Sequence, residues 1–488
     1  MIHLDRASDI ALTDQIVTQL AGLVQDGQLP PGTRLPSIRK LAATLSVSAA
    51  TVVGAYDRLA ARGLIEARAA SGYFVSARRT ALPLPAVAAP AGPGLDAIAL
   101  MRNMLERRPG VAHVGSGFLP ESWLEDMLSA RLLARVARKG AKSYARPGTP
   151  AGYAPLRQQI ALQLGFAGIA AAPDQVLLTF GATHGAEILC RALLAPGDVV
   201  AVEEPGYFAL FAQLRGMGVK MLAVPRTPQG PDLSVLASVC DTFRPKLLFT
   251  QTLLHNPTGS STDAATAFHM LDLARRYDFR IVEDDVYGDL HPVANPLRLA
   301  QVDRFERVIF LGSYSKVLSP SIRVGYMVCA PALVPLFLEQ KLLGVLATSE
   351  FDERLVYELL ASGAYRKHIE RVRERLLHNR AKVVLGLAQA GLQPTLETEG
   401  GLFVWAGLPE NVDLPLLIEH AAQHGWMLTP GDAFFLRHAE RPYLRFNAAA
   451  SLDSKLFDYL RTTLPSFARG AGAAAPGSAA IAARAPGA

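Results

Sequence analysis

The sequence predicts an α/β protein in which a small winged helix precedes a larger domain with a mainly parallel central sheet. Three observations lead to this prediction. Short helical patterns and a pair of alternating strands occupy the first 78 residues. A proline- and alanine-rich stretch then interrupts all periodicity. Beyond it, apolar runs of strand length alternate with helical patterns, which is typical of a parallel sheet covered by helices on both faces.

The composition is that of a globular protein with a slight basic excess. The chain has 488 residues and a formal net charge of +6, which permits contact with nucleic acid without requiring it. Its three cysteines lie far apart and lack metal-ligand spacing, so they indicate buried thiols in a reducing compartment and no metal site. There is no signal-peptide core, and no uncharged apolar run reaches the roughly 18 residues of a membrane helix. We therefore expect a cytoplasmic protein without a membrane partner.

Residues 10–78 show the pattern of a winged helix. Apolar residues at helical spacing predict a first helix that ends at Gly27. Ser37 and Ser48 are placed to cap a second and a third helix across a short turn, an arrangement typical of a helix-turn-helix. Residues 64–76 alternate around a glycine-containing turn, which predicts a β-hairpin. The third helix would enter the major groove, and the hairpin would touch the DNA backbone or minor groove.

Five short stretches of this segment resemble the winged-helix domain of the GntR family of bacterial regulators. They are residues 32–39, 47–53, 56–59, 63–65 and 71–75. The resemblance implies contacts to double-stranded operator DNA from Arg39, Ser48, Thr51, Ser71 and Gly72. Where the family often has arginine at the start of the third helix, this chain has Ala49. Either specificity shifts to the wing and to DNA shape, or the domain binds weakly. A small domain that contacts only protein is the alternative.

The remaining boundaries follow from composition. Residues 79–95 are rich in proline and alanine and predict a semi-extended linker. We place the large domain at 96–466, with a smaller α/β unit from about 331 to 466. Residues 467–488 contain almost no bulky apolar side chains and are predicted to be disordered.

A lysine between two apolar runs is the centre of the predicted site. Lys316 follows the run 308–311, and Arg323 and a second run, 324–328, come after it. Partial burial disfavours the charged form of a lysine and leaves a free amine, which can form a Schiff base with a carbonyl compound. Ser313 and Arg323 suit a bound phosphate. Together these features predict a site for pyridoxal 5'-phosphate. The alternative is a solvated loop lysine.

Other predicted strands also end in residues that suit this cofactor. The loop 181–185 opens a helix and offers backbone N–H groups to a phosphate, although any strand-turn-helix has the same appearance. Tyr207 is placed to stack on a flat ring, and Asn256 to donate to a ring oxygen. Asp284 would pair with a protonated pyridine nitrogen, and Tyr287 would then reach the ring oxygen. The alternative for Asp284 is a helix cap or a surface turn. The carboxyl ends of parallel strands meet at one edge of a sheet, so we expect these residues to converge.

From about residue 115 to 464, the order and spacing of these residues resemble the class I and II aminotransferases of fold type I. The resemblance implies that Lys316 is the Schiff-base lysine and that Asp284 pairs with the pyridinium nitrogen. It also implies that Asn256 and Tyr287 bind the ring hydroxyl and that Tyr207 stacks on the ring. The phosphate would be bound by Ala182, Thr183, Ser313 and Arg323.

Two further residues come from the same resemblance. Tyr144 matches a tyrosine that reaches the phosphate in the neighbouring subunit, which implies a homodimer with shared sites. Arg445 matches the arginine that binds the α-carboxylate of a substrate in a two-pronged bond. An arginine inside an apolar strand is also typical of an internal ion pair, which is the alternative for Arg445.

A winged helix followed by an aminotransferase-like domain is the arrangement of the MocR (PdxR-like) subfamily of GntR regulators. This resemblance implies a transcriptional regulator that depends on pyridoxal phosphate and senses an amino acid or amine through aldimine exchange at Lys316. An active aminotransferase with an appended DNA-binding domain remains open, because the residues for a half-reaction are present. A third possibility is a sensor of the cofactor itself.

Overall fold

The computed structural model describes most of the chain as two compact units, Met1–Leu84 and Pro85–Ala488. The described residues are 4–6, 11–61, 63–68, 71–76, 97–106, 108–395, 398, 400–437 and 439–468. The predicted linker, 79–95, therefore lies outside the described residues, as do residues 469–488 of the predicted tail, 467–488. The first two tail residues were predicted to be disordered but are ordered: Phe467 ends a 3-10 helix, and Ala468 pairs with Val412.

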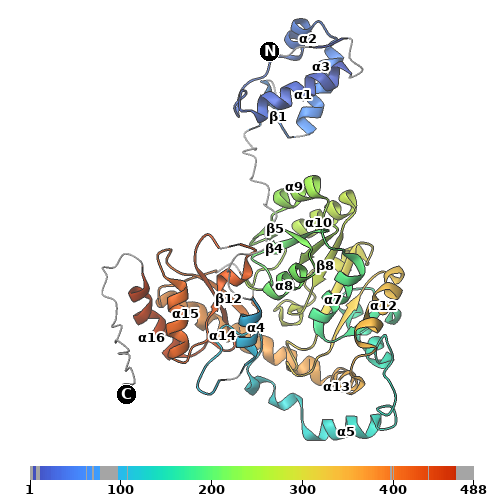
Figure 1. Cartoon of the computed structure of the whole chain (residues 1–488), viewed down its shortest axis with the longest axis vertical. Coiled ribbons are helices and arrows are strands. Elements are labelled where there is room, and N and C mark those ends of the chain that lie inside the picture. Colours follow the sequence, from blue (N-terminus) through green and yellow to red (C-terminus); the bar gives the residue numbers. More distant parts are fainter. Residues whose placement is uncertain are drawn as a thin grey trace, which may run out of the picture. The chain divides into compact units, whose positions relative to one another are not determined.

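In its described residues, the front unit contains three helices and a β-hairpin (Figure 1). Its elements are α1 (Leu12–Gln25), α2 (Ile38–Leu45), α3 (Ala49–Ala61), β1 (Ile65–Arg68) and β2 (Gly72–Val75), with the two strands paired antiparallel. Ser37 Oγ accepts a hydrogen bond from the Lys40 N–H at 3.3 Å, and Ser48 Oγ accepts one from the Thr51 N–H at 3.1 Å. Both serines thus cap their helices as predicted.

The turn between α2 and α3 gives these helices the geometry of a helix-turn-helix. The chain bends by 118° between them, within the range of about 90–120° that is usual for this motif. Tyr56 of α3 is buried in the core of the unit, and its hydroxyl donates to the Pro36 carbonyl at 2.8 Å. In the described part of the chain, no single helix is long and apolar enough to cross a membrane. The helices α2 and α3 reach the required length and composition only when they are counted together, and the chain is bent between them.

An eight-stranded mixed sheet forms the centre of the large unit (Figure 1). Its strands, in spatial order, are β3 (Val176–Thr179), β10 (Gly325–Val328), β9 (Val308–Ser313), β8 (Arg280–Asp284), β7 (Leu247–Thr250), β4 (Val199–Glu204), β5 (Lys220–Thr227) and β6 (Gly230–Pro231). From β9 to β5 all neighbours are parallel, as predicted, whereas β10 and β6 pair antiparallel with their neighbours.

The reversed strand β10 decides where two of the predicted site residues lie. Its first residue, Gly325, pairs with Ser313, the last residue of β9. The connection that carries Lys316 and Arg323 therefore leaves and re-enters the sheet at one edge. This is the edge at which the parallel strands end, where ligands of α/β proteins bind.

Both faces of the sheet are covered, which explains why its strands are apolar throughout. Alternate residues of the central strands belong to two different clusters. Val200, Leu247 and Ile309 pack with α7 (Gly181–Leu193), α8 (Phe208–Gly216) and α12 (Val334–Val345). Ala201, Leu248 and Phe310 pack with the opposite layer, which includes α9 (Leu233–Phe243) and α10 (Ala264–Tyr277).

A second, smaller sheet lies in the C-terminal part. Its four strands are all antiparallel, in the order β11 (Gln393–Pro394), β12 (Phe403–Gly407), β14 (Tyr443–Asn447) and β13 (Thr429–Pro430). The remaining helices of the large unit are α4 (Ala97–Leu105), α5 (Ala130–Gly140), α6 (Ala154–Phe166), α11 (Leu299–Asp303), α13 (Glu350–Ala361), α14 (Ala364–Gln389), α15 (Leu414–Gln423) and α16 (Ser454–Thr463).

Candidate cofactor site and DNA-binding element

One cavity of about 500 Å³ lies at the edge where the parallel strands end. It is lined by every residue predicted to bind the cofactor or the effector, with the exception of Tyr144: Ala182, Thr183, Tyr207, Asn256, Asp284, Tyr287, Ser313, Lys316, Arg323 and Arg445. The large unit therefore brings together residues from segments that are more than 250 positions apart in the sequence.

Lys316 lies in the β9–β10 connection with its amine against aromatic rings. Its Nζ is 4.1 Å from the centre of the Phe118 ring. Burial, together with the positive charges of Arg445 and Arg323, lowers the pKa of Lys316 to about 7. A Cβ at Gly117 would lie 3.6 Å from Nζ, which is an ordinary contact distance, so the backbone at Gly117 passes close to the amine. Near neutral pH a large fraction of this lysine is the neutral nucleophile.

Asp284 is the last residue of β8, and one of its oxygens has no partner. Its Oδ2 accepts a hydrogen bond from Gln251 Nε2 at 2.8 Å, whereas Oδ1 is buried without a hydrogen-bond partner. Burial raises the pKa of Asp284 to about 6. A buried carboxylate oxygen without a donor is costly, and a protonated ring nitrogen is a donor that would satisfy it.

Arg445 is buried in β14 without a carboxylate partner among the described residues. Its Nε and Nη2 donate to the Gly115 carbonyl at 3.2 and 2.7 Å, and its Nη1 donates to Asn256 Oδ1 at 2.7 Å. The ring of Phe403 lies 4.4 Å from the guanidinium carbon. Burial lowers the pKa of Arg445 to about 10. These contacts therefore show no internal ion pair for Arg445 among the described residues, and the guanidinium borders the cavity.

The two predicted tyrosines line the same cavity. Tyr287 is buried with its ring edge-on to Phe403 at 5.1 Å, and burial raises the pKa of its phenol, which stays protonated. Tyr207 is half-buried just before α8, burial raises the pKa of its phenol as well, and its hydroxyl bonds to Thr183. Both can donate from neutral hydroxyl groups at neutral pH.

The start of α7 and Arg323 form the part of the cavity that suits a phosphate. Gly181 begins α7 with a φ of +76°, a conformation that favours glycine. A Cβ at this position would come within 2.8 Å of Arg323 Nη2. His184 Nδ1 accepts from the Phe180 N–H at 3.1 Å, and Ala182 and Thr183 line the cavity. The first turn of a helix attracts an anion through its free N–H groups.

Tyr144 does not reach this cavity in its own chain. Its hydroxyl donates to the Val136 carbonyl at 3.1 Å, and its ring lies 5.7 Å from that of Phe351. Its predicted contact with the phosphate of a neighbouring subunit stays a prediction.

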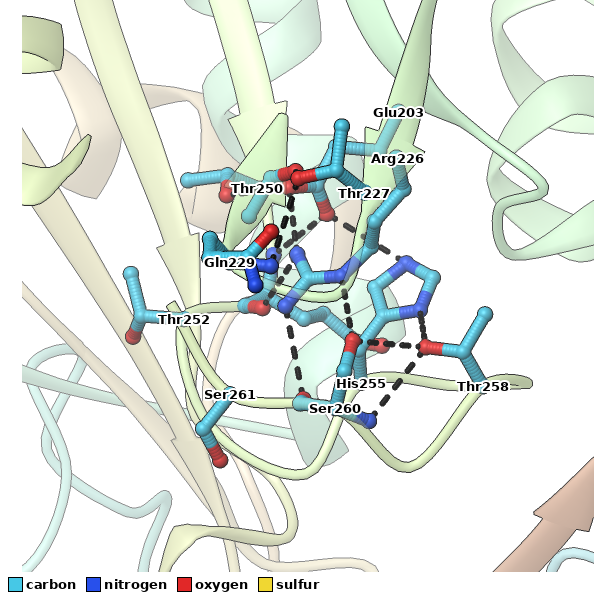
Figure 2. A network of polar contacts seen from close by, with 12 residues as sticks. Glu203, Arg226, Thr227, Gln229, Thr250, Thr252, His255, Thr258, Ser260 and Ser261 are labelled. Carbon is cyan, nitrogen blue, oxygen red and sulfur yellow. Dashed lines mark hydrogen bonds and ion pairs between the residues drawn. The ribbon is translucent and has the colours of Figure 1, made fainter. Parts of the chain in front are cut away.

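A buried polar network, which the sequence did not reveal, borders the same cavity (Figure 2). Glu203, next to the end of β4, accepts from Arg226 Nη1 at 2.6 Å, from the Thr250 hydroxyl at 2.8 Å and from the Gln251 N–H at 3.0 Å. His255 Nε2 lies 3.3 Å from the carboxylate. Burial acts to raise the pKa of Glu203, but Arg226 and His255 outweigh it and lower that pKa to about 2.

Gln251 connects this network to the cofactor residues. Its backbone is held by Glu203, its side-chain N–H donates to Asp284 Oδ2, and its side-chain oxygen accepts from the Asn256 N–H at 2.8 Å. Within the sequence, the only hint of this role is a polar residue directly after an apolar strand. Phe118, also missed, has no comparable signal.

The predicted DNA-binding residues are on the surface of the front unit. Arg39 is exposed on α2. Gly72, the first residue of β2, and Ser71, which directly precedes it, are also exposed. Ser48 is also exposed, but its Oγ is 2.7 Å from the Thr51 hydroxyl. Ser48 and Thr51 thus bond to each other at the start of α3, in addition to the capping bond. In the described part of the chain, no three His, Cys, Asp or Glu residues are grouped to hold a metal ion.

Two families match this chain. The family "Aminotransferase class I and II" matches residues 114–464, and "Bacterial regulatory proteins, gntR family" matches residues 12–75. The protein therefore belongs to the class I and II aminotransferase family and carries a GntR winged helix in front of that domain. This is the arrangement of the MocR-like regulators with a helix-turn-helix.

Relatives of known sequence and structure fall into the same two groups. The HTH-type transcriptional regulator YdcR of Escherichia coli is 28% identical over 445 residues, which cover 89% of this chain and 94% of YdcR. The probable rhizopine catabolism regulatory protein MocR of Rhizobium meliloti is 29% identical over 457 residues, 88% of each chain. The α-aminoadipate aminotransferase LysN of Thermus thermophilus, solved with N-(5'-phosphopyridoxyl)-L-leucine, superposes with a TM-score of 0.70 at 28% identity over 75% of this chain and 95% of LysN.

The residues of the cavity fit pyridoxal 5'-phosphate. Asp284 Oδ1 lacks the donor that a protonated pyridine nitrogen would supply. The Lys316 amine is buried with a lowered pKa, and the start of α7 together with Arg323 provides N–H donors for a phosphate. Pyridoxal 5'-phosphate is therefore the cofactor of this chain.

Proposed function

We propose that the protein is a DNA-binding transcriptional regulator whose large unit senses an amino acid or amine by means of pyridoxal phosphate. The observation that carries this proposal is the presence, in one chain, of a GntR winged helix and a cavity that holds a lysine with a pKa of about 7. When bound, the cofactor supplies an aldehyde that reacts with primary amines and a ring that takes up electrons.

In this proposal each residue of the cavity has a defined role. Lys316 supplies the amine that an effector replaces, and Asp284 keeps the ring nitrogen protonated. Asn256 and Tyr287 bind the ring hydroxyl, and Tyr207 stacks on the ring. Arg445 binds the effector carboxylate, which supports an amino acid over a simple amine because that guanidinium has no carboxylate partner among the described residues. The phosphate contacts come from Ala182, Thr183, Ser313 and Arg323.

On DNA, the proposal assigns contacts to Arg39 and to the wing residues Ser71 and Gly72, with Ser48 and Thr51 at the start of α3. Binding of the effector alters DNA affinity only if it favours one of two conformers of the protein. The coupling is typically about 1–3 kcal/mol, or roughly 5–150-fold in affinity. We further propose a cytoplasmic homodimer in which Tyr144 contributes to the partner's site.

An electrophoretic shift assay on the DNA upstream of the protein's own gene tests this function. The full chain is compared without cofactor, with pyridoxal phosphate, and with pyridoxal phosphate plus a panel of amino acids. We expect an amino acid to change DNA affinity in the wild type and not in Lys316→Ala. No change with any amino acid would contradict the proposal, and a change with pyridoxal phosphate alone would indicate a sensor of the cofactor itself.

Active transamination is the second candidate, because the residues that a half-reaction needs, Lys316, Asp284 and Arg445, are present and line one cavity. The two functions differ in what happens after an amino acid is added. A regulator keeps the amino acid bound, with a stable visible absorption band. An aminotransferase releases a keto acid and converts its cofactor to pyridoxamine phosphate, which absorbs at shorter wavelength.

A further inference from the structure

The outward side of α3, in the front unit, is apolar over its first turns. Ala49, Ala50 and Val53 are exposed there, and Val53 is 37% exposed. Val53 is three residues from Ala50 and four from Ala49, and residues at these spacings share one side of a helix. The opposite side is buried, with Val52 and Tyr56 in the core of the unit. The start of α3 therefore presents methyl groups to any molecule that lies against it.

The same part of α3 has little capacity for hydrogen bonds to bases. Residues 49–56 contain no Arg, Lys, Asn or Gln, the side chains that read guanine or adenine through two-pronged hydrogen bonds. The two hydroxyl groups at the start of the helix, on Ser48 and Thr51, are 2.7 Å apart and bond to each other. Ser48 Oγ also accepts from the Thr51 N–H at 3.1 Å. Their hydrogen-bonding capacity is thus partly used within the chain.

The positive charges near this surface come from the preceding elements. Arg39 and Lys40 are exposed on α2. Arg6 is also exposed, and its Nη2 donates to the Ser46 carbonyl at 2.6 Å, in the turn between α2 and α3. Such cations suit the phosphates of DNA, whose contacts fix the position of a protein on the duplex but do not read its sequence. The charged groups and the apolar surface are therefore separate.

Double-stranded DNA offers one apolar group to a helix in its major groove, the C5-methyl group of thymine, which alanine side chains contact. A protein partner could also cover an apolar surface. The exposed cations on α2 and at the turn, together with the match of residues 12–75 to the GntR family, favour DNA as the occupant.

We propose that α3 reads thymine, with Ala49, Ala50 and Val53 packed against thymine methyl groups in the major groove. This inference rests on the proposed DNA-binding function, which it deepens by naming the base and the groove. Specificity then stays on α3, although Ala49 stands where an arginine is frequent in the family. The operator carries T·A pairs opposite the first two turns of this helix.

Base analogues test the inference on the full chain loaded with pyridoxal phosphate. Duplexes that the protein binds are first selected from a random pool. Each thymine is then replaced in turn by deoxyuridine, which lacks only the methyl group. We expect binding about 4-fold weaker for each contacted thymine, the usual effect of one buried methyl group. Diaminopurine in place of adenine adds an amino group in the minor groove only, and at the same base pairs it should have little effect.

The variant Val53→Ala identifies the side chain that contacts the methyl group. It should weaken binding to the thymine duplex by about 4-fold and leave binding to the duplex with uracil at the contacted position unchanged. The slope of log affinity against log salt concentration should stay the same, since no phosphate contact is lost. Val293→Ala is the matched control, because it makes the same change in a side chain that is 53% exposed in the large unit. It should alter neither affinity.

A second variant should reverse the preference of α3. Ala49→Arg supplies a guanidinium that can form a two-pronged bond to guanine, so guanine should replace thymine at one position of the selected duplexes. Continued selection of thymine there would contradict the placement of Ala49 against a base.

Three other outcomes would overturn the inference. Uracil could bind as tightly as thymine at every position, or diaminopurine and not uracil could weaken binding, which would mean reading from the minor groove. Val53→Ala could leave DNA affinity unchanged and alter the oligomeric state, which would make the surface a protein contact. If no duplex is selected from the pool, the proposed DNA-binding function itself is wrong.

Discussion

Arg445 donates a hydrogen bond from Nη1 to the side-chain oxygen of Asn256 at 2.7 Å. The residue proposed for the effector carboxylate is thereby joined to a residue proposed for the cofactor ring. A guanidinium buried without a counter-ion is unfavourable, and a carboxylate ligand would offset that cost. The same bond orients the Asn256 amide, so that its oxygen faces Arg445 and its N–H₂ group is turned to other partners.

Replacing Arg445 by methionine should weaken amino-acid binding and spare simple amines. A hydrogen bond to a charged group contributes about 1.5–3 kcal/mol, so we expect a loss of about 10–150-fold in affinity for L-leucine. Isoamylamine, which is L-leucine without its carboxylate, should bind the variant and the wild type alike. Titration of the cofactor absorbance measures both. Equal losses for the two ligands would show that Arg445 acts on the cofactor and not on the carboxylate.

Cofactor uptake should depend on pH through Lys316. The pKa of Lys316 is lowered from 10.5 to about 7, so the neutral amine predominates above pH 7 and is the minor form below it. The rate at which the apoprotein gains visible absorbance should therefore rise from pH 6 and level off near about pH 8. Asp284 acts to raise this pKa, so Asp284→Asn should move the midpoint to lower pH. A rate that keeps rising beyond pH 9 would mean that the pKa of Lys316 is not lowered from the usual value of a lysine, 10.5.

The residues at the ends of strands could be predicted from the chain, because an apolar run marks a buried strand and the residue that follows it lies at the sheet edge. Lys316, Asp284 and Asn256 were found in this way. The direction of β10 could not be predicted, since a run such as 325–328 has the same composition in either direction. The spacing therefore predicted that Arg323 lies at the site, but it did not give the reason. The reason is that β10 runs antiparallel to β9, so the connection between them begins and ends at one edge of the sheet.

Contacts between segments that are far apart in the sequence could not be predicted from apolar runs and the residues that follow them. Gln251 holds Asp284 and the backbone of Asn256, but a glutamine after a strand has many possible partners. Phe118 lies beside Lys316 although nearly 200 residues separate them in the sequence. An ion pair and a ligand site would place the same arginine in the same apolar strand, so the sequence could not distinguish them. The observed contacts of Arg445 include no carboxylate among the described residues, and its role in ligand binding stays a prediction.

DNA binding should depend on Arg39, which is exposed on α2. Loss of one arginine contact to DNA costs about 1–3 kcal/mol, or roughly 5–150-fold in affinity. We expect this loss for Arg39→Ala in a shift assay on the upstream DNA, with cofactor absorbance unchanged. Arg461→Ala is a suitable control, because this side chain is 59% exposed on α16 in the large unit. Wild-type affinity in Arg39→Ala would refute the proposed placement of the helix-turn-helix on DNA.

The network around Glu203 should be important for stability (Figure 2). In Arg226→Met the Glu203 carboxylate loses its closest counter-ion, which lies at 2.6 Å in the wild type. Breaking a buried ion pair on one side typically costs about 3–5 kcal/mol. Urea unfolding at pH 7 should show such a loss in Arg226→Met. The double variant Arg226→Met with Glu203→Gln should recover part of it, because no buried charge is then left without a partner.

The sign of the pH dependence gives this prediction a second measurement. In the wild type the pKa of Glu203 is lowered from 4.5 to about 2, so its stabilising contribution is present above pH 4.5 and is lost as the pH falls toward 2. Without Arg226, the positive charge that opposes the effect of burial is gone. Burial then raises the pKa of Glu203 in the folded state. The folded variant then retains a proton that the unfolded chain has lost, and its deficit in unfolding free energy should grow from pH 5 to pH 7. A deficit that does not change with pH would mean that Arg226 stabilises the fold by packing and not through the charge of Glu203.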